Sequence, residues 1–378
     1  MIKFNEPYIT GMEEFYLKDV LKRNHFYGNG YYTEKCHNLI KNKISCENVL
    51  LTDSCTSALE ICALLLRDWN KRQEVIVPSY TFSSTAAAFA RAGYKIVFAE
   101  IDPMTMMLDA SKIESKISSE TAAIVLVHYG GFGGKAKAFK EICKKNSIYL
   151  VEDAAQAYGC IEDNNYLGTV GDFGCFSFHE TKNLHAGLSG ALVVNNNNFY
   201  QRAVHIWERG TNRQEVIKGI ADKYSWVEVG GSFYPTELQS AFLYAQLEAF
   251  ENNLADRREI FSGYNEVFSK ALGNSIIYPK ISNNFQTNYH AFWLLFSSEA
   301  ECNYVRTELL KESIHAYIGY VPLHSSKVGS SMGYKASDLE ITEDVSKRIL
   351  RLPIHSQMSK TDAEMIANLV INYLKEFK

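Results

Sequence analysis

Short β-branched runs alternate with helix-like runs through the first half of the chain, and this alternation limits the fold more than any other feature. The pairs are N-V-L-L-T (48–52) with T-S-A-L-E-I-C-A-L-L-L (56–66), V-I-V-P (75–78) with S-S-T-A-A-A-F-A-R-A-G (83–93), and A-A-I-V-L-V-H (122–128) with A-K-A-F-K-E-I-C-K-K-N (136–146). Further strand-like runs are K-I-V-F-A-E-I (95–101), I-Y-L-V-E-D (148–153), F-G-C-F-S-F (173–178) and A-L-V-V-N (191–195). Strands joined by helices in this way form a mainly parallel sheet covered on both faces, so we expect an α/β fold.

The pattern changes after residue 250, and a chain of 378 residues is long for a single core. Residues 1 to about 45 look helical, and a long helical pattern runs from Thr236 into the 260s. Beyond it lie the strand-like runs Y-H-A-F-W-L-L-F (289–296) and H-A-Y-I (315–318), and helices near 302–312 and 361–376. We expect a large domain over 1–250, with the N-terminal helical segment, and a smaller α+β domain over 251–378.

Composition excludes several classes of protein. The formal net charge is −4 and no basic run stands out, which argues against nucleic acid as a partner. The N-terminus M-I-K-F-N-E-P lacks the apolar run of a signal peptide, and the longest apolar runs are too short to span a membrane. The eight cysteines contain no C-x-x-C pair, so we expect neither a metal site nor a disulfide framework. A cytoplasmic enzyme is the expectation.

A carboxylate stands at the end of one predicted strand, in L-V-E-D-A-A-Q (150–156). Ligands bind at the carboxyl ends of parallel strands in open α/β sheets. Asp153 there could keep the pyridinium nitrogen of pyridoxal phosphate protonated, and Gln156 could bind the phenolic oxygen of its ring. The alternative is an ordinary solvated strand end.

Two other turns between strand and helix carry candidate ligand-binding residues. In T-D-S-C-T-S-A-L-E (52–60), small polar residues begin a helix, which suits either a phosphate or a simple N-cap. In P-S-Y-T-F-S-S-T (78–85), Phe82 could stack on a flat cofactor or could pack in the core.

A glycine cluster, Y-G-G-F-G-G-K (129–135), raises a different possibility. It follows a strand and precedes a helix, with Glu152-Asp153 about twenty residues later, as in dinucleotide-binding proteins. The G-x-G-x-x-G register is missing, however, and glycine-rich turns are common for steric reasons. NAD binding is therefore an alternative.

Lys182 lies in F-S-F-H-E-T-K-N (176–183), 29 residues after Asp153. With it, the other candidate residues can be explained by one ligand. A lysine amine can form a Schiff base with pyridoxal phosphate, and desolvation lowers its pKa enough for it to act as a base. A phosphate cradle, a stacking ring, a carboxylate and a lysine together favour this cofactor.

With these motifs the chain resembles the pyridoxal phosphate-dependent sugar-nucleotide aminotransferases of the DegT/StrS type over essentially its whole length. The resemblance is carried by V-L-L-T-D-S-C-T-S-A-L-E (49–60), E-V-I-V-P-S-Y-T-F-S-S-T-A (74–86), V-E-D-A-A-Q-A-Y-G (151–159), G-C-F-S-F-H-E-T-K-N (174–183), G-T-N-R (210–213) and Y-V-P-L-H (320–324). S-F-H-E-T-K-N, G-T-N-R and D-K-Y-S-W (222–226) are most similar to the subgroup that aminates dTDP-4-keto-6-deoxy-glucose at C4.

The resemblance implies a fold-type-I transferase acting as a homodimer, with each active site completed by the neighbouring subunit. L-glutamate would give its amino group and leave as 2-oxoglutarate, with pyridoxamine phosphate as the intermediate form of the cofactor. The product would be a 4-amino-4,6-dideoxy sugar, galacto or gluco, for surface polysaccharide such as the O-antigen of lipopolysaccharide. The implied residues are Lys182 for the Schiff base, Asp153 for the ring nitrogen, Gln156 for the ring oxygen, Phe82 for the ring face, Cys55, Thr56 and Ser177 for the phosphate, and Tyr320, His324 and Arg213 for the sugar nucleotide.

Two segments depart from the family pattern. Gly187-Leu188-Ser189-Gly190 stands where many relatives read G-E-G-G, and Tyr234 stands where many carry an asparagine that reaches the partner's phosphate. Three alternatives remain: a sugar dehydratase of the same fold, whose known examples carry histidine at the lysine position, a non-catalytic regulatory protein, and an NAD-dependent oxidoreductase.

Overall fold

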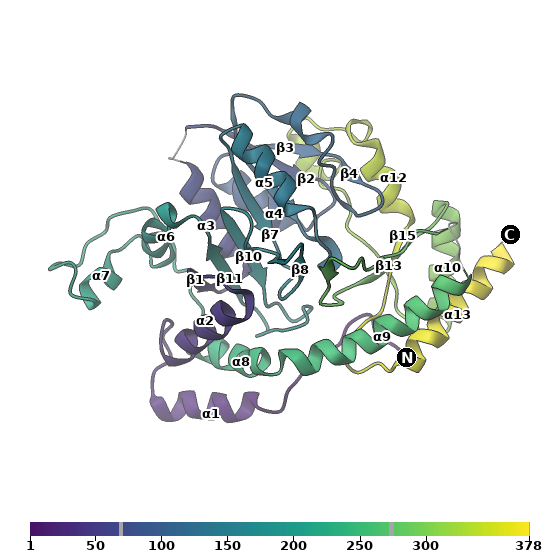
Figure 1. Ribbon diagram of the computed structural model, residues 1–378, viewed down its shortest axis with the longest axis horizontal. Coiled ribbons are helices and arrows are strands. Elements are labelled where there is room, and N and C mark those ends of the chain that lie inside the picture. The colour runs from purple at the N-terminus through teal and green to yellow at the C-terminus, as the bar shows by residue number, and fades with distance from the viewer. Residues whose placement is uncertain (68–70, 272–275, 378) are drawn as a thin grey trace.

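A seven-stranded sheet forms the centre of the molecule (Figure 1). The computed structural model describes residues 1–67, 71–271 and 276–377. The strand order is β1-β11-β10-β7-β6-β2-β3, and only β11 runs antiparallel to its neighbours. The strands are β1 (Val49–Thr52), β2 (Glu74–Pro78), β3 (Lys95–Ala99), β6 (Thr121–Val127), β7 (Tyr149–Asp153), β10 (Phe173–Ser177) and β11 (Gly190–Val194). The prediction of a mainly parallel sheet is confirmed.

Both faces of this sheet are buried, which explains why its strands read as continuous apolar runs. Val75 and Val77 of β2 belong to the core under helices α3, α4 and α6, whereas Ile76 belongs to the core under α5. Successive side chains of a strand point to opposite faces, so a central strand needs an apolar residue at every position. These helices are α3 (Cys55–Arg67), α4 (Ser83–Arg91), α5 (Ala136–Lys145) and α6 (Tyr200–Trp207).

The N-terminal segment forms two helices, α1 (Glu13–Arg23) and α2 (Tyr31–Ile44), which pack with α8 (Glu237–Glu248) beside the sheet. The prediction of helix over residues 1 to 45 is wrong for residues 1–12 and for the connection 24–30 between the two helices. The first of these stretches contains Pro7 and Gly11, which disfavour a helix, and Ile2 instead pairs with Ile314 near the other end of the chain.

A second, smaller sheet stands beside the first, with strand order β13-β15-β14 and antiparallel pairing throughout. Its strands are β13 (Phe292–Leu295), β14 (Tyr317–Ile318) and β15 (Ile349–Leu352), and the helices near it are α9 (Phe250–Ala271), α10 (Glu299–Lys311), α11 (Lys327–Ser331), α12 (Glu340–Arg348) and α13 (Lys360–Phe377). A separate hydrophobic core lies between one face of this sheet and α9, α10 and α13. The domain boundary near residue 250, between α8 and α9, stays a prediction.

The remaining elements are short. They are β4 (Ile101–Asp102), β5 (Met107–Leu108), β8 (Ile161–Glu162), β9 (Asn165–Tyr166), β12 (Phe285–Gln286) and α7 (Arg213–Ile217). The segment that carries α7 projects from the body of the molecule (Figure 1). Within the described ranges, the helices are all too short or too polar to cross a membrane.

Candidate active site

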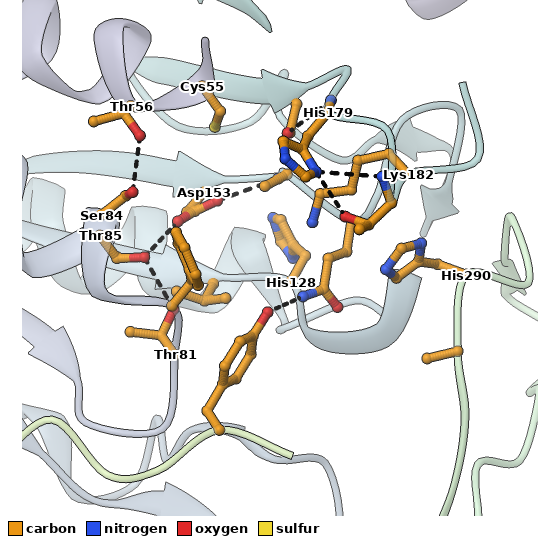
Figure 2. Close-up of a pocket in the computed structure, with 18 of the residues that line it drawn as sticks. Cys55, Thr56, Thr81, Ser84, Thr85, His128, Asp153, His179, Lys182 and His290 are labelled. Atoms are coloured by element: carbon orange, nitrogen blue, oxygen red, sulfur yellow. Dashed lines mark hydrogen bonds between the residues drawn. The ribbon is translucent and has the colours of Figure 1, made fainter. Parts of the chain in front are cut away.

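A cavity of about 540 Å³ opens at the carboxyl ends of the parallel strands (Figure 2). Its walls come from the ends of β6, β7 and β10, from the beginnings of α3 and α4, and from β15 of the small sheet. Phe4 and Asn5 of the N-terminal segment also line it. Residues far apart in the sequence therefore meet at the sheet edge where the sequence predicted a ligand.

Lys182 lies in the tight connection between β10 and β11 and lines the cavity. The Lys182 N–H donates to the carbonyl of His179 at 2.8 Å, and Glu180 N–H donates to the carbonyl of Gly187 at 2.9 Å. Burial lowers the pKa of the Lys182 amine to about 8, and the charge of Arg351 acts in the same direction. A substantial fraction of the amine is then neutral near pH 7 to 8, as a nucleophile or a base requires.

Asp153, the last residue of β7, is only 5% exposed. Its carboxylate accepts a hydrogen bond from the Thr85 hydroxyl at 2.7 Å and one from the Ala155 N–H at 3.2 Å. Burial raises the pKa of this carboxyl group, while these two bonds and the charge of Lys182 oppose the rise. Within the described ranges no basic side chain forms an ion pair with it, so a cationic ring nitrogen would find the carboxylate available.

The neighbouring acid, Glu152, points away from Asp153 because successive residues of a strand face opposite sides. It accepts a hydrogen bond from His128 Nε2 at 2.8 Å and one from the Gly168 N–H at 2.9 Å. His128 Nδ1 in turn accepts from the Gly134 N–H at 3.3 Å, so that Nε2 carries the proton. This fixes the imidazole ring in the wall of the cavity.

The glycines of the cluster at 129–135 allow other parts of the chain to pack closely around the site. A Cβ added at Gly131, where φ is +81°, would lie 2.2 Å from the Asn288 side-chain oxygen. The Gly130 N–H donates to Gln156 Oε1 at 2.7 Å. The cluster thus positions Gln156 and His128, and this accounts for its glycines without a dinucleotide.

Cys55 and Thr56 begin α3 directly behind β1, and Ser177 at the end of β10 faces the same cavity. A Cβ added at Gly190 would lie 2.5 Å from the Cys55 backbone nitrogen, so this glycine lets the chain pass close to the helix start. The Thr56 hydroxyl donates to Ser84 Oγ at 2.8 Å. A helix N-terminus surrounded by hydroxyl groups is suited to a phosphate.

Gln156, Tyr320 and Phe82 form a second wall. Gln156 Nε2 donates to the Tyr320 hydroxyl at 2.7 Å, and the Tyr320 ring centre lies 6.3 Å from that of Phe82. Phe82 is 60% exposed, so it is not a core residue, and it lines the cavity where a flat ring could rest against it.

The structure does not bring every expected residue to this cavity. His324 is fully buried, with Nδ1 2.7 Å from Ser79 Oγ, and does not line the cavity. Arg213 begins α7 on the projecting segment, where it pairs with Glu208 at 2.8 Å. Within this protomer, neither residue is placed to contact a ligand in the cavity.

The two segments that depart from the family pattern are also resolved. Tyr234 is buried. Its hydroxyl forms hydrogen bonds with the Tyr27 hydroxyl and with the Arg209 guanidinium. Leu188 lines the cavity, whereas the Ser189 hydroxyl donates to the Thr52 carbonyl at 3.1 Å.

Sequence reasoning missed Thr85, His128, His290 and Arg351, all of which line the cavity. Thr85 stands two residues after Ser83 in the same strand-to-helix turn as Phe82, so its position was a usable signal. His128 ends a strand that the sequence did predict. Arg351 gave no signal, because its strand was not predicted.

Taken together, these residues fit pyridoxal phosphate. The cavity offers a lysine amine of lowered pKa, a carboxylate without a cationic partner, and a helix N-terminus with hydroxyl groups, in a volume of about 540 Å³. The lysine amine suits the cofactor's aldehyde, and the carboxylate suits its ring nitrogen. The helix N-terminus with its hydroxyl groups suits its phosphate.

Comparison with known proteins gives relatives along the whole chain. An uncharacterised protein of Methanocaldococcus jannaschii is 30% identical over 355 residues, which cover 92% of this chain and 91% of the relative. GDP-perosamine synthase of Escherichia coli O157:H7 is 25% identical, with 98% of each chain covered. The dTDP-4-dehydro-2,3,6-trideoxy-D-glucose 4-aminotransferase of Saccharopolyspora spinosa is 25% identical, covering 97% of this chain and 95% of the relative.

Solved structures share the fold. Spr1654 of Streptococcus pneumoniae in its PMP-form has a TM-score of 0.91 at 20% identity, and the aminotransferase TlmJ of Streptoalloteichus hindustanus has a TM-score of 0.90 at 25% identity, with both chains fully covered in each case. Spr1654 has also been solved in its PLP-form. The expected fold type I is confirmed.

The model of the DegT/DnrJ/EryC1/StrS aminotransferase family matches residues 7–371, and the chain therefore belongs to this family of pyridoxal phosphate-dependent aminotransferases.

Proposed function

We propose that this enzyme transfers the amino group of L-glutamate to C4 of a nucleotide-linked 4-keto-6-deoxy sugar. The observation that carries the proposal is the meeting of Lys182 and Asp153 in one cavity at the edge of the large sheet. The relative from Saccharopolyspora spinosa is named a 4-aminotransferase of a dTDP-linked keto sugar, and the relative from Escherichia coli makes a GDP-linked amino sugar. Both names support a nucleotide sugar as the amino acceptor.

For the acceptor we propose dTDP-4-keto-6-deoxy-D-glucose, which would become a dTDP-4-amino-4,6-dideoxy-hexose for surface polysaccharide, including O-antigen. The support is the resemblance of S-F-H-E-T-K-N (177–183), G-T-N-R (210–213) and D-K-Y-S-W (222–226) to the subgroup that uses this sugar. The relatives carry different nucleotides, so the choice of dTDP depends on these motifs.

The cavity residues would divide the work of holding the cofactor. Asp153 would pair with the ring nitrogen, Gln156 would bind the ring oxygen, and Phe82 would cover one face. The phosphate would be bound by Cys55 and Thr56 at the start of α3 and by Ser177 at the end of β10. When bound, pyridoxal phosphate supplies an aldehyde that accepts the amino group and a ring that withdraws electrons from it.

Lys182 would be both the anchor of the cofactor and the group that moves protons. In the first half of the reaction its amine would take the proton from the α-carbon of L-glutamate and pass it to the cofactor, and hydrolysis by water would release 2-oxoglutarate. In the second half it would take that proton back and deliver it to C4 of the sugar. One group can act as base and then as acid if its pKa lies near the working pH, and a pKa of about 8 satisfies this requirement.

We further propose that the enzyme works as a homodimer whose neighbouring subunits complete each other's sites. The support is the projecting segment around α7, which exposes large apolar side chains to water: Ile217, Ile220, Tyr224, Trp226 and Val229. Exposed apolar patches of this kind mark protein–protein contacts.

We also propose a cytoplasmic location. It is supported by the cysteines, all eight of which are described and remain free thiols.

The test is a direct assay of the holoenzyme with L-glutamate and the 4-keto-6-deoxy sugars linked to dTDP, GDP and UDP. We expect 2-oxoglutarate and an amino sugar in equal amounts, fastest with the dTDP sugar, and neither product with the Lys182→Ala variant. NMR coupling constants of the product then distinguish the galacto from the gluco configuration. Absence of 2-oxoglutarate with every sugar would contradict the proposal, and a preference for GDP or UDP would contradict only the nucleotide.

A further inference from the structure

The first residues of the chain form an N-terminal strap, residues 2–8, that crosses from the small sheet to the connection between β10 and β11. At one end, the Lys3 carbonyl accepts a hydrogen bond from His355 Nε2 at 3.1 Å, just beyond β15. At the other end, the Tyr8 carbonyl accepts one from His185 Nε2 at 2.7 Å, in the connection after β10. The backbone is therefore fixed at both ends of the strap, and the residues between are held in place.

Phe4 and Asn5 lie between these two points and line the cavity that contains Lys182 and Asp153. The Phe4 ring packs edge-on against Tyr317 of β14, with the ring centres 5.0 Å apart. Asn5 follows directly in the chain and is half-buried. The first residues of a domain are poorly ordered unless they are tied down, and here they are tied down on both sides of Asn5. This asparagine is thus a fixed part of the cavity wall.

The Asn5 amide differs from the other polar groups of this wall. Each of the other neutral hydroxyl, amide and imidazole side chains that line the cavity makes at least one hydrogen bond. Within the described part of the chain, the Asn5 amide makes none. An asparagine amide has two N–H donors and a carbonyl acceptor. All of them are therefore available to a ligand in the cavity.

The cofactor does not need this amide, because each of its polar groups has another partner in the proposed function. Asp153 would pair with the ring nitrogen, Gln156 would bind the ring oxygen, and the start of α3 with the end of β10 would hold the phosphate. The group that Asn5 receives therefore belongs to a substrate.

Of the two substrates, the sugar matches an amide better. The carboxylates of L-glutamate carry charge, and a charged donor binds a carboxylate more strongly than a neutral amide does. A sugar hydroxyl is neutral and both donates and accepts hydrogen bonds, and the Asn5 amide offers a partner for each.

We infer that Asn5 binds a ring hydroxyl group of the acceptor sugar and so helps to select it, an inference that rests on the proposed function. In a 4-keto-6-deoxy-hexose, C2 and C3 carry hydroxyl groups, and C3 is bonded to the C4 that must reach Lys182. A hydrogen bond selects a substrate well when the protein group cannot move to another partner, and the two ends of the strap prevent such movement.

The experiment measures the two half-reactions of the holoenzyme separately. The change in cofactor absorbance is followed against L-glutamate and then, with the aminated enzyme, against dTDP-4-keto-6-deoxy-D-glucose. For Asn5→Ala we expect kcat/KM for the sugar to fall about 5- to 10-fold, as loss of a neutral hydrogen bond does, and kcat/KM for L-glutamate to change less than about 2-fold.

A sugar without the hydroxyl groups tests their contact with Asn5. The sugar in the name of the Saccharopolyspora spinosa relative, dTDP-4-dehydro-2,3,6-trideoxy-D-glucose, keeps the ketone at C4 but has no hydroxyl at C2 or C3. The wild type should use it less well than the hydroxylated sugar. Asn5→Ala should narrow this difference about 5- to 10-fold, because the trideoxy sugar has no hydrogen bond to the amide that the substitution could remove.

A binding measurement gives a further readout that does not depend on turnover. dTDP-6-deoxy-D-galactose, which has a hydroxyl in place of the C4 ketone and cannot react, should bind the holoenzyme in calorimetry and lose affinity about 5- to 10-fold in Asn5→Ala. The matched control is Asn198→Ala, which removes the amide of an exposed asparagine outside the cavity and should leave all three measurements unchanged.

Three results would overturn the inference: an unchanged response to the sugar in Asn5→Ala, an equal loss in both half-reactions, or an equal loss with the hydroxylated and the trideoxy sugar. The second would show that Asn5 only keeps the strap in place, and the third that its amide acts on another part of the substrate. If the aminated wild type itself does not respond to the keto sugar, the proposed function fails first, and the two failures are thus distinguishable.

Discussion

The Asp153 carboxylate and the Lys182 amine line one cavity, Asp153 at the end of β7 and Lys182 in the connection that follows the adjacent strand β10, and each shifts the pKa of the other. Asp153 ends β7 and pairs in register with Cys175 of β10, the strand that leads to Lys182. Burial is the largest influence on both groups, raising the pKa of Asp153 and lowering that of Lys182, and their mutual attraction opposes both shifts. Burial therefore sets the direction of both pKa shifts, and each group limits the shift of the other.

Replacing Lys182 should abolish transamination. Lys182→Ala removes the amine, and Lys182→Arg keeps a cation that cannot lose its proton, so both variants should lose at least about 1,000-fold in kcat. Formation of 2-oxoglutarate measures the loss, and borohydride reduction of the wild-type holoenzyme should attach the cofactor to the peptide containing Lys182. The control is Lys116→Ala, an exposed lysine. If Lys182→Arg kept substantial activity, Lys182 could not be the proton carrier.

Thr85 should matter through its hydrogen bond to Asp153. Thr85→Val keeps the shape of the side chain but removes the donor that lies 2.7 Å from the carboxylate. The carboxylate then holds its negative charge less readily, and we expect kcat to fall about 10-fold, in line with the loss of one hydrogen bond to a charged group. Thr85→Ser restores the hydroxyl and should recover most of kcat. Equal kcat values for the Val and Ser variants would show that the hydroxyl has no such role.

The large sheet was predictable because its physical cause is local. Each central strand must be apolar on both faces, as Val75, Ile76 and Val77 are, and that pattern is visible in any short window of sequence. The cofactor candidates were predictable for a related reason. Asp153 and Ser177 end such strands, and the ends of parallel strands meet at one edge of the sheet.

What could not be predicted depends on contacts between distant parts of the chain. Phe292 pairs with Leu352, sixty residues later, and a strand as short as β15 leaves no periodic pattern, so Arg351 was missed. His324 belongs to Y-V-P-L-H (320–324), one of the motifs that carry the family resemblance, but its ring is bonded to Ser79 in the interior of this protomer. A one-dimensional motif gives no measure of which way such a side chain points.

The cofactor-free protein should show a pH-dependent cost of burying Lys182. The pKa of this amine falls from 10.5 when exposed to about 8 in the fold, so below pH 8 the fold must bury a charge. This cost disappears as the pH rises from about 8 to 10.5, because the folded state then releases the proton that the unfolded state still binds. Lys182→Met should therefore raise the free energy of unfolding at pH 7, and the gain should shrink by pH 9.

Urea unfolding of both proteins at pH 7, 8 and 9 measures the difference directly. The same experiment with Lys116→Met corrects for the general effect of removing a positive charge. A gain in the free energy of unfolding that stayed constant across these pH values would mean that the amine is not held in a desolvated position.

The projecting segment around α7 should hold the dimer together. Trp226 is 76% exposed in the single protomer, and Trp226→Glu places a charge where the proposed contact must be dry. We expect the variant to sediment as a monomer at concentrations at which the wild type is a dimer, and to lose activity because a lone subunit has an incomplete site. Met104→Glu is the matched control, since Met104 is 58% exposed on the β4–β5 turn, away from this segment. An active monomeric Trp226→Glu protein would show that each protomer contains a whole active site, and a dimeric one would place the interface elsewhere.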